Sequence, residues 1–171
     1  KVHADQLSAS GGARLAAELG CTSADHLDML SPEDARLLEE AGTVPVFLPG
    51  ATMFIGKRTF PDRGLFAPDT PIALSTDYNP GSCMTSNLLL MGTLGCVQCS
   101  MSPIEAWAGI TTAAARALDI ETVAGHLGKG AQADFVIFNT DNAIEPLYHY
   151  GTSCIRDVYK GGQRITSTKM S

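Results

Sequence analysis

The sequence has few charged residues, few aromatic residues and no cluster of basic residues. Of its 171 residues, 18% are charged and 6% are aromatic, and 12 basic residues stand against 18 acidic ones for a formal net charge of -6. A protein that binds a phosphate backbone is expected to carry clustered Lys and Arg. The composition therefore argues against nucleic acid as a partner.

Long apolar runs and a regular cysteine framework are also lacking. The longest uncharged stretch, residues 79–101, is interrupted by polar residues and glycines, whereas a membrane-spanning helix needs about 20 predominantly apolar residues. The 5 cysteines are odd in number and scattered, in a chain too large to depend on disulfides, and no signal peptide is recognisable. We therefore expect no membrane partner and a reducing, cytoplasmic compartment.

The remaining composition is that of a globular α/β protein. With 44% hydrophobic residues the chain is able to bury a substantial core. Over its first two thirds, short apolar or β-branched runs alternate with helical patterns, which is typical of βα units and a parallel sheet. We expect an irregular connection at residues 51–63. The expected strands are residues 1–3, 22–26, 43–48 and 71–75, and the expected helices are residues 7–19, 32–41, 85–99, a helix opened by the capping box at 102–105, and 112–118.

After Ile120 the pattern changes to short strands separated by glycines, at residues 134–138, 154–159 and 164–165. The four preceding strands match half of a (β/α)₈ barrel. The chain is too short to form a whole barrel, which needs roughly 250 residues and about 200 at the least. A compact doubly wound sheet of four strands is the alternative. Since the sequence opens on Lys1-Val2-His3 without an initiator Met, we expect the numbering to begin inside a longer protein.

Three side chains that can bind metal fall at the carboxyl ends of separate expected strands: His3, His26 and Asp77. In parallel α/β folds this end of the sheet is where active sites are built. Two imidazoles and a carboxylate suit zinc or iron. The alternative interpretation is that each histidine is simply hydrogen-bonded at its strand end.

Four ordered motifs, and a fifth segment nearer the end of the chain, carry a family resemblance. The motifs are His3-Ala4-Asp5-Gln6, Ser23-Ala24-Asp25-His26-Leu27, Leu48-Pro49-Gly50-Ala51 and Thr76-Asp77-Tyr78-Asn79-Pro80-Gly81-Ser82. In this order and spacing they resemble the imidazolonepropionases of the amidohydrolase superfamily. The fifth segment, Gly128 to Ile137, is shared by many amidohydrolases and indicates only the superfamily.

This resemblance implies a fold and a reaction. Residues 1–122 would form the C-terminal half of a (β/α)₈ barrel, strands five to eight, and residues 123–171 would contribute strands to a small composite β-sandwich. The implied reaction is hydrolysis of the cyclic amide 4-imidazolone-5-propanoate to N-formimidoyl-L-glutamate in histidine degradation. One divalent ion, zinc or iron, would activate the attacking water.

The resemblance also implies roles for individual residues. His3 and Asp77 would be metal ligands, and His26 would sit beside the metal-bound water as general base and oxyanion stabiliser. Asp77 would share the proton transfer while bound to the metal.

Four more residues are expected to contact the substrate. Asn79, Gly81 and Ser82 would hold it near its propionate or its ring amide. Gln6 stands where some family members have Glu, and an amide can position substrate or water but cannot act as a base. We therefore expect Gln6 to contact substrate or water.

The family takes two further ligands from a His-x-His pair, which this sequence lacks: its histidines are His3, His26, His126 and His149. We expect that pair from the N-terminal half of the same enzyme, in a homodimer, and expect the 171-residue chain alone to be inactive and to bind metal weakly. Two alternatives stay open, another cyclic amidohydrolase or deaminase, and a non-catalytic half-barrel. Asp5 and Asp25 are equally compatible with orienting the imidazoles and with capping strand ends.

Overall fold

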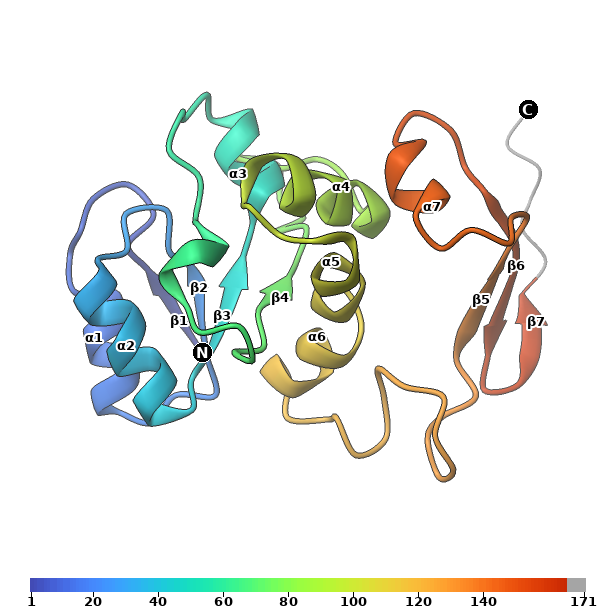
Figure 1. Cartoon of the computed structure of the whole chain (residues 1–171), viewed down its shortest axis with the longest axis horizontal. Helices are drawn as coiled ribbons and strands as arrows, with labels where there is room; N and C mark the ends of the chain where they lie inside the picture. The colour runs from blue at the N-terminus through green and yellow to red at the C-terminus, as the bar shows by residue number, and fades with distance from the viewer. Residues whose placement is uncertain (166–171) are drawn as a thin grey trace.

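Two β-sheets organise the chain in a computed structural model that describes residues 1–165 (Figure 1). The first sheet has 4 parallel strands in the order β1-β2-β3-β4, so the α/β class with a parallel sheet is confirmed. Its strands are β1 Val2–Ala4, β2 Ser23–His26, β3 Val44–Phe47 and β4 Ala73–Leu74.

The strand order settles one alternative. A doubly wound sheet reverses its strand order at a switch point, but here each strand lies beside the next one along the chain. The alternative of a doubly wound sheet is therefore wrong. Within residues 1–165, β1 and β4 each pair on one side only, which leaves both edges of this sheet open.

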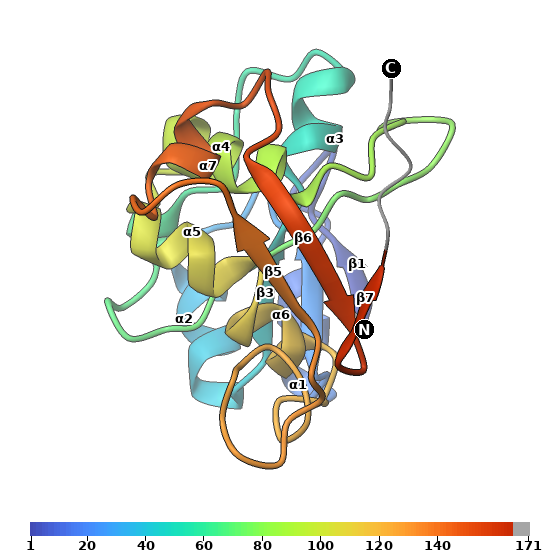
Figure 2. The same cartoon turned by 90° about the vertical axis from the view of Figure 1, so that its right-hand side faces the viewer.

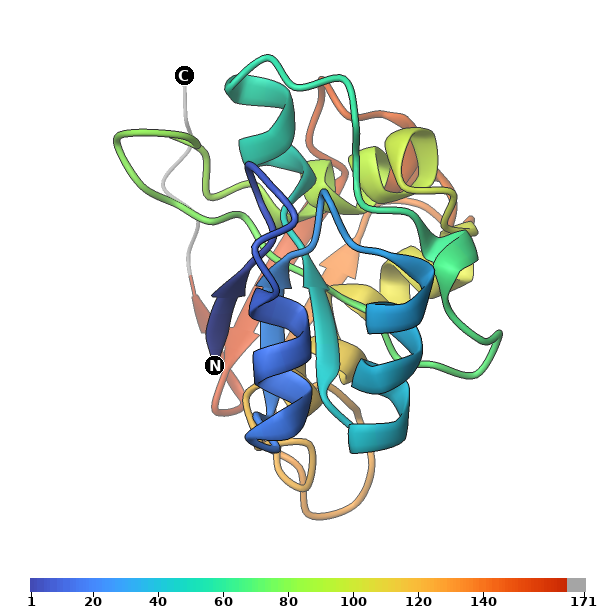
Figure 3. The ribbon, with the colours of Figure 1, turned by 90° about the vertical axis from the view of Figure 1, so that its left-hand side faces the viewer.

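Helices α1 (Gly12–Glu18) and α2 (Pro32–Ala41) lie side by side over one face of the sheet (Figure 3). Small residues of the strands, such as Ala4 and Ala24, pack in the same buried cluster as Ala and Leu side chains of these helices. Gly12 is required at this contact, because a Cβ there would lie 2.9 Å from the Cα of Ala4. The first helix begins at Gly12, later than the expected residue 7.

Helices α4 (Leu88–Gln98) and α5 (Pro103–Gly109) extend this layer beside β4. The predicted capping box is confirmed, since Ser102 and Glu105 exchange side-chain and main-chain hydrogen bonds at the start of α5. Helix α6 (Thr112–Ala117) packs elsewhere: Ala113 and Ala117 share a second buried cluster with residues of β3 and β4.

One expectation for a connecting segment is wrong, and one helix was not expected. Residues 51–63 are not wholly irregular, because helix α3 spans Pro49–Phe54 and a 3₁₀ turn, η1, spans Arg63–Leu65. Helix α7 (Glu145–Tyr148) was not anticipated in the strand-rich part of the chain. It forms because Leu147 is buried in the main core and its main-chain oxygen accepts a hydrogen bond from Thr93 at 2.6 Å.

The second sheet is antiparallel, in the order β5-β6-β7 (Figure 2). Its strands are β5 Phe135–Phe138, β6 Ile155–Lys160 and β7 Gln163–Ile165. Trp107 of α5 anchors this sheet. Its ring packs edge to face on that of Phe138, with the ring centroids 5.6 Å apart, and its Nε1 donates a hydrogen bond of 2.7 Å to the main-chain oxygen of Ala143. The expected second segment, residues 123–171, extends into residues 166–171, which lie outside the described part of the chain. In the part of the chain that the structure describes, no helix has the length and apolar character needed to cross a membrane.

Candidate active site

The structure brings the three predicted metal-site residues together at the carboxyl ends of the parallel strands. His3 lies on β1, His26 is the last residue of β2, and Asp77 follows β4. The ring centroids of His3 and His26 are 4.2 Å apart, and Nε2 of His26 lies 3.9 Å from Oδ2 of Asp77. Two imidazoles and one carboxylate from distant parts of the sequence therefore form one cluster.

An unusual backbone conformation sets the direction of the His26 and Asp77 side chains. His26 and Asp77 have φ angles of 77° and 51°, in the left-handed region that non-glycine residues rarely adopt, and Leu27 has a φ of 67°. Such conformations cost of order 1–3 kcal/mol each and cluster at functional sites. The strand ends are thus strained at the residues for which chemistry is expected.

His26 is an uncharged imidazole at neutral pH. Burial, and then the neighbouring His3, lower its pKa to about 4, while Asp77 acts in the opposite direction. Its contact with Asp77 is consequently not an ion pair at pH 7. Within residues 1–165, the Nδ1 atom of His26 is buried without a hydrogen-bond partner.

The loop carrying Asp77 is shaped by Asn79, Gly81 and Ser82. Asn79 donates through Nδ2 to the main-chain oxygen of Asp77 at 2.6 Å and to Oγ of Ser82 at 2.8 Å. Its Oδ1 accepts from the backbone N–H groups of Gly81 and Ser82, and Ser82 Oγ donates to Oδ2 of Asp77 at 3.2 Å. Ser82 therefore contacts the Asp77 carboxylate, while Asn79 and Gly81 shape the loop around it. The contact of these three residues with substrate stays a prediction.

The loop after β1 contains Asp5 and Gln6. Asp5 is buried, and its carboxylate accepts hydrogen bonds from four backbone N–H groups at the start of α1, those of Ser10, Gly11, Gly12 and Ala13. Asp5 therefore caps its own loop rather than orienting an imidazole. Asp25 instead approaches Lys1, with Oδ1 3.5 Å from its Nζ. Gln6 is half-buried beside this site, and its proposed contact with substrate or water stays a prediction.

Sequence reasoning missed three polar residues beside this cluster: Asp28, Thr52 and Lys57. Oγ1 of Thr52 donates to Oδ1 of Asp28 at 2.5 Å, and Nζ of Lys57 donates to the main-chain oxygen of Gln6 at 2.6 Å. Asp28 is buried, which raises its pKa. For Asp28, the sequence offered only its position two residues beyond His26. Burial and contacts between distant segments leave no local sequence pattern.

The donor set fits part of a metal site. Imidazole nitrogen and carboxylate oxygen are ligands for zinc and iron, and His3 and Asp77 both lie beside the ring of His26, whose Nδ1 has no hydrogen-bond partner within residues 1–165. Among residues 1–165, however, no group of three His, Cys, Asp or Glu side chains is arranged to hold an ion by itself. His3 and Asp77 therefore fit as members of a ligand set that needs further donors.

Comparison with known proteins gives close sequence relatives. The imidazolonepropionase of Geobacillus kaustophilus (strain HTA426) is 41% identical over 167 residues, which are 98% of this chain and 39% of that protein. The imidazolonepropionase of Staphylococcus saprophyticus is 39% identical over 171 residues, 99% of this chain and 41% of that protein. These matches confirm the resemblance read from the motifs. The chain spans about two fifths of the length of these relatives.

Solved structures share the fold. The ochratoxinase of A. niger superposes with a TM-score of 0.72 at 21% identity, over 94% of this chain and 40% of that one. An adenosine deaminase from Xanthomonas campestris with bound zinc gives a TM-score of 0.69 at 18% identity, over 86% of this chain and 38% of that one. The model of the amidohydrolase family matches residues 2–165. The chain therefore belongs to the amidohydrolase family.

Proposed function

We propose that this chain is part of an enzyme that hydrolyses 4-imidazolone-5-propanoate to N-formimidoyl-L-glutamate. The observation that carries the proposal is the convergence of His3, His26 and Asp77 at the carboxyl ends of β1, β2 and β4. The similarity to imidazolonepropionases over nearly the whole chain supports this substrate rather than another cyclic amide or an aminopurine.

His3 and Asp77 would hold one divalent ion, zinc or iron. When bound, such an ion lowers the pKa of water toward about 7 and polarises the ring carbonyl. His26 would handle the proton, because its neutral ring is close to Asp77 and is able to accept one. In the reaction, water adds to the ring carbonyl carbon, the ring C–N bond breaks, and His26 delivers the proton to the departing nitrogen.

The residues around these three would orient the substrate. Gln6 lies on the loop after β1, whereas Asn79, Gly81 and Ser82 lie on the loop that carries Asp77. The side-chain amide of Gln6 is able to donate to a carboxylate such as the propionate. The N–H groups of Gly81 and Ser82 and the amide of Asn79 are engaged within their own loop, where they fix its shape. Ser82 would also fix Asp77 through its hydroxyl group.

The open sheet edges fit an assembly with more chain. We propose that residues 1–122 supply strands five to eight of a (β/α)₈ barrel and that residues 123–171 supply strands of a composite β-sandwich. The N-terminal half of the same enzyme would close the barrel and add a His-x-His ligand pair, within a homodimer. A cytoplasmic location belongs to this proposal and is supported by five cysteines that are all free thiols.

The proposal is tested by assaying the full-length protein that contains this chain. We expect turnover of the imidazolone and at least a 10³-fold loss in kcat for His26→Ala and Asp77→Ala, because each removes a group needed in the transition state. His149→Ala is the control, since this exposed histidine lies beside α7. Normal turnover in the Asp77 variant would overturn the mechanism. Turnover of an aminopurine or another cyclic amide in place of the imidazolone would overturn the substrate.

A further inference from the structure

The side chain of Lys57 reaches from the segment after α3 to the loop after β1. Its side chain is half-buried, and its Nζ donates to the main-chain oxygen of Gln6 at 2.6 Å. This is a charge-assisted hydrogen bond, which is stronger than one between neutral groups. It joins Gln6 to a residue 51 positions further along the chain. Figure 3 shows the loop after β1 rising toward α3, whose end precedes Lys57.

The same segment, residues 49–57, also holds the loop after β2. Thr52 of α3 donates through Oγ1 to Asp28 at 2.5 Å, and Asp28 lies two residues beyond His26. Thr52 and Lys57 are joined by a backbone hydrogen bond of 3.1 Å. Residues 49–57 therefore fix two loops at once: one follows His3 and contains Gln6, and the other follows His26.

Within residues 1–165, the backbone hydrogen bonds between these two loops end at Asp5. The backbone N–H of Leu27 donates to the oxygen of Ala4 at 3.0 Å, and that of Met29 donates to the oxygen of Asp5 at 2.9 Å. Gln6 is the next residue, and its main-chain oxygen accepts the hydrogen bond from Nζ of Lys57. Lys57 thus gives Gln6 a contact with residues 49–57 in addition to the backbone hydrogen bonds that end at Asp5.

We propose that Lys57 is a positioning residue that holds Gln6 against the substrate. The inference rests on the proposed function, in which Gln6 contacts substrate or water. Loss of the ammonium group frees the main chain at Gln6 while His26 and Asp77 keep their places. The substrate then binds less tightly, and the chemical step at the ring carbonyl is less affected.

The first test needs no activity. In the full-length protein, Lys57→Met keeps an unbranched side chain of nearly the same length and removes its charge, whereas Lys57→Arg keeps a donor. We expect amide hydrogen exchange in a peptide covering residues 5–13 to rise at least fivefold in Lys57→Met and to return toward the wild-type rate in Lys57→Arg. Arg58→Met is the matched control, because Arg58 is exposed and makes no hydrogen bond or ion pair within residues 1–165. Equal exchange in Lys57→Met and Arg58→Met would overturn the proposal.

The second test uses hydrolysis of the imidazolone. We expect Lys57→Met to raise KM about three- to tenfold with kcat changed less than twofold, as for a lost binding interaction. If Lys57 acts by placing the side chain of Gln6, it has little further effect on KM in a Gln6→Ala background. An equal effect in both backgrounds, or a loss confined to kcat, would overturn the role. A wild-type enzyme that leaves the imidazolone intact defeats the proposed function instead, and the exchange measurement still decides whether Lys57 holds the loop.

Discussion

At the scale of single residues, Asp5 shows how a carboxylate beside the site serves structure. Its Oδ1 accepts backbone N–H groups from Ser10, Gly11 and Gly12, and its Oδ2 accepts that of Ala13 at 2.9 Å. Burial acts to raise the pKa of Asp5, but these hydrogen bonds outweigh it and lower the pKa. The carboxylate thereby satisfies donors at the start of α1 that have no partner inside the helix.

We predict that Asp5→Ala lowers the free energy of unfolding by about 2–4 kcal/mol, because four backbone donors, one buried and three partly buried, lose their acceptor at once. Asp5→Asn should cost less, since its amide oxygen still accepts from part of this set. Urea unfolding of the full-length protein measures both. Asp69→Ala is the control, because Asp69 is exposed. A shared unfolding midpoint for the Asp5→Ala and Asp69→Ala proteins would contradict this account.

Residue chemistry and position predicted the candidate site, but not what holds it. His3, His26 and Asp77 were recognisable because each follows the apolar pattern of a strand, and strand ends converge in a parallel sheet. The parts played by Thr52, Asp28 and Lys57 depend on contacts between segments far apart in the sequence. Asp5 was left undecided between two roles, since only the position of the α1 N-terminus separates them.

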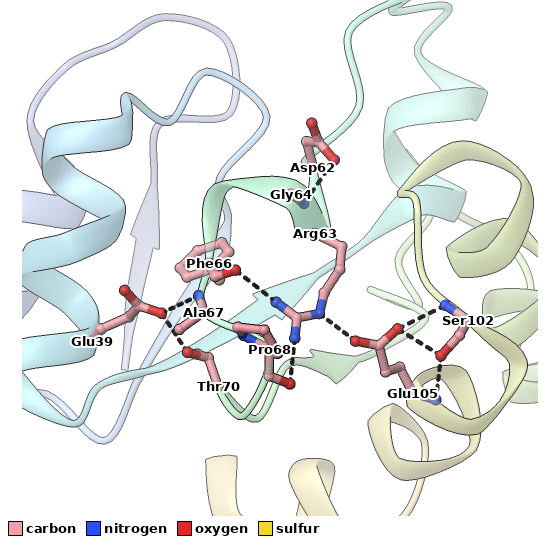
Figure 4. Close-up of polar contacts among 10 residues, drawn as sticks. All are labelled: Glu39, Asp62, Arg63, Gly64, Phe66, Ala67, Pro68, Thr70, Ser102 and Glu105. Atoms are coloured by element: carbon pink, nitrogen blue, oxygen red, sulfur yellow. Dashed lines mark hydrogen bonds and ion pairs between the residues drawn. The ribbon is translucent and has the colours of Figure 1, made fainter.

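At the scale of elements, an arginine joins the connection before β4 to helix α5 (Figure 4). Arg63 is 7% exposed, and its Nε donates to Oε1 of Glu105 at 2.6 Å. Its terminal nitrogens donate to the main-chain oxygens of Phe66 and Pro68. Glu105 in turn accepts from the backbone N–H and the hydroxyl group of Ser102 at the start of α5. The capping box of α5 and the Arg63 network therefore share one carboxylate.

This network predicts a pH dependence of stability. Although burial acts to raise it, hydrogen bonds from Ser102 and Arg63 lower the pKa of Glu105 from 4.5 to about 2. Because the pKa is lower in the folded state, the stabilisation is fully present above pH 4.5 and is lost as the pH falls toward 2. We expect Glu105→Gln to be about 1–2 kcal/mol less stable at pH 7, a figure reduced for partial exposure.

Urea unfolding of the wild-type and Glu105→Gln proteins from pH 7 to pH 2.5 measures the difference in their unfolding free energies directly. The difference in unfolding free energy between the wild type and Glu105→Gln should narrow below pH 4.5, because the wild type loses the stabilisation from the Glu105 carboxylate. The other carboxylates titrate equally in the two proteins and cancel in the difference. A gap that stays constant over this range would mean that Glu105 does not carry the effect.

Elements with strong local signals were predicted, and elements made by tertiary contacts were not. Helices α2 and α5 begin at Ser-Pro pairs with an acidic residue close behind, a pattern that signals a helix start. Helix α3 is too short to be stable from its own hydrogen bonds. It forms because its first four residues are buried, and Gly50 admits Met91 and Cys83 against its backbone.

At the scale of the whole molecule, the parallel sheet places the candidate site at one end of its strands and leaves both of its edges unpaired within residues 1–165. The antiparallel sheet packs beside the helices through Trp107, away from this cluster (Figures 1 and 2). Sequence patterning indicated both sheets and the change between them near Ile120. Among residues 1–165 no group of three His, Cys, Asp or Glu side chains is arranged to hold an ion, so further ligands belong to the proposed function.

In the proposed function, His3 and Asp77 bind one catalytic ion and His26 beside them carries the proton. Elemental analysis of the purified full-length protein and its variants tests it most directly. We predict about one zinc or iron per wild-type chain, a loss of most of this metal in His3→Ala, and near-normal metal without hydrolysis in His26→Ala. A His3→Ala protein that keeps the full metal content would contradict the account.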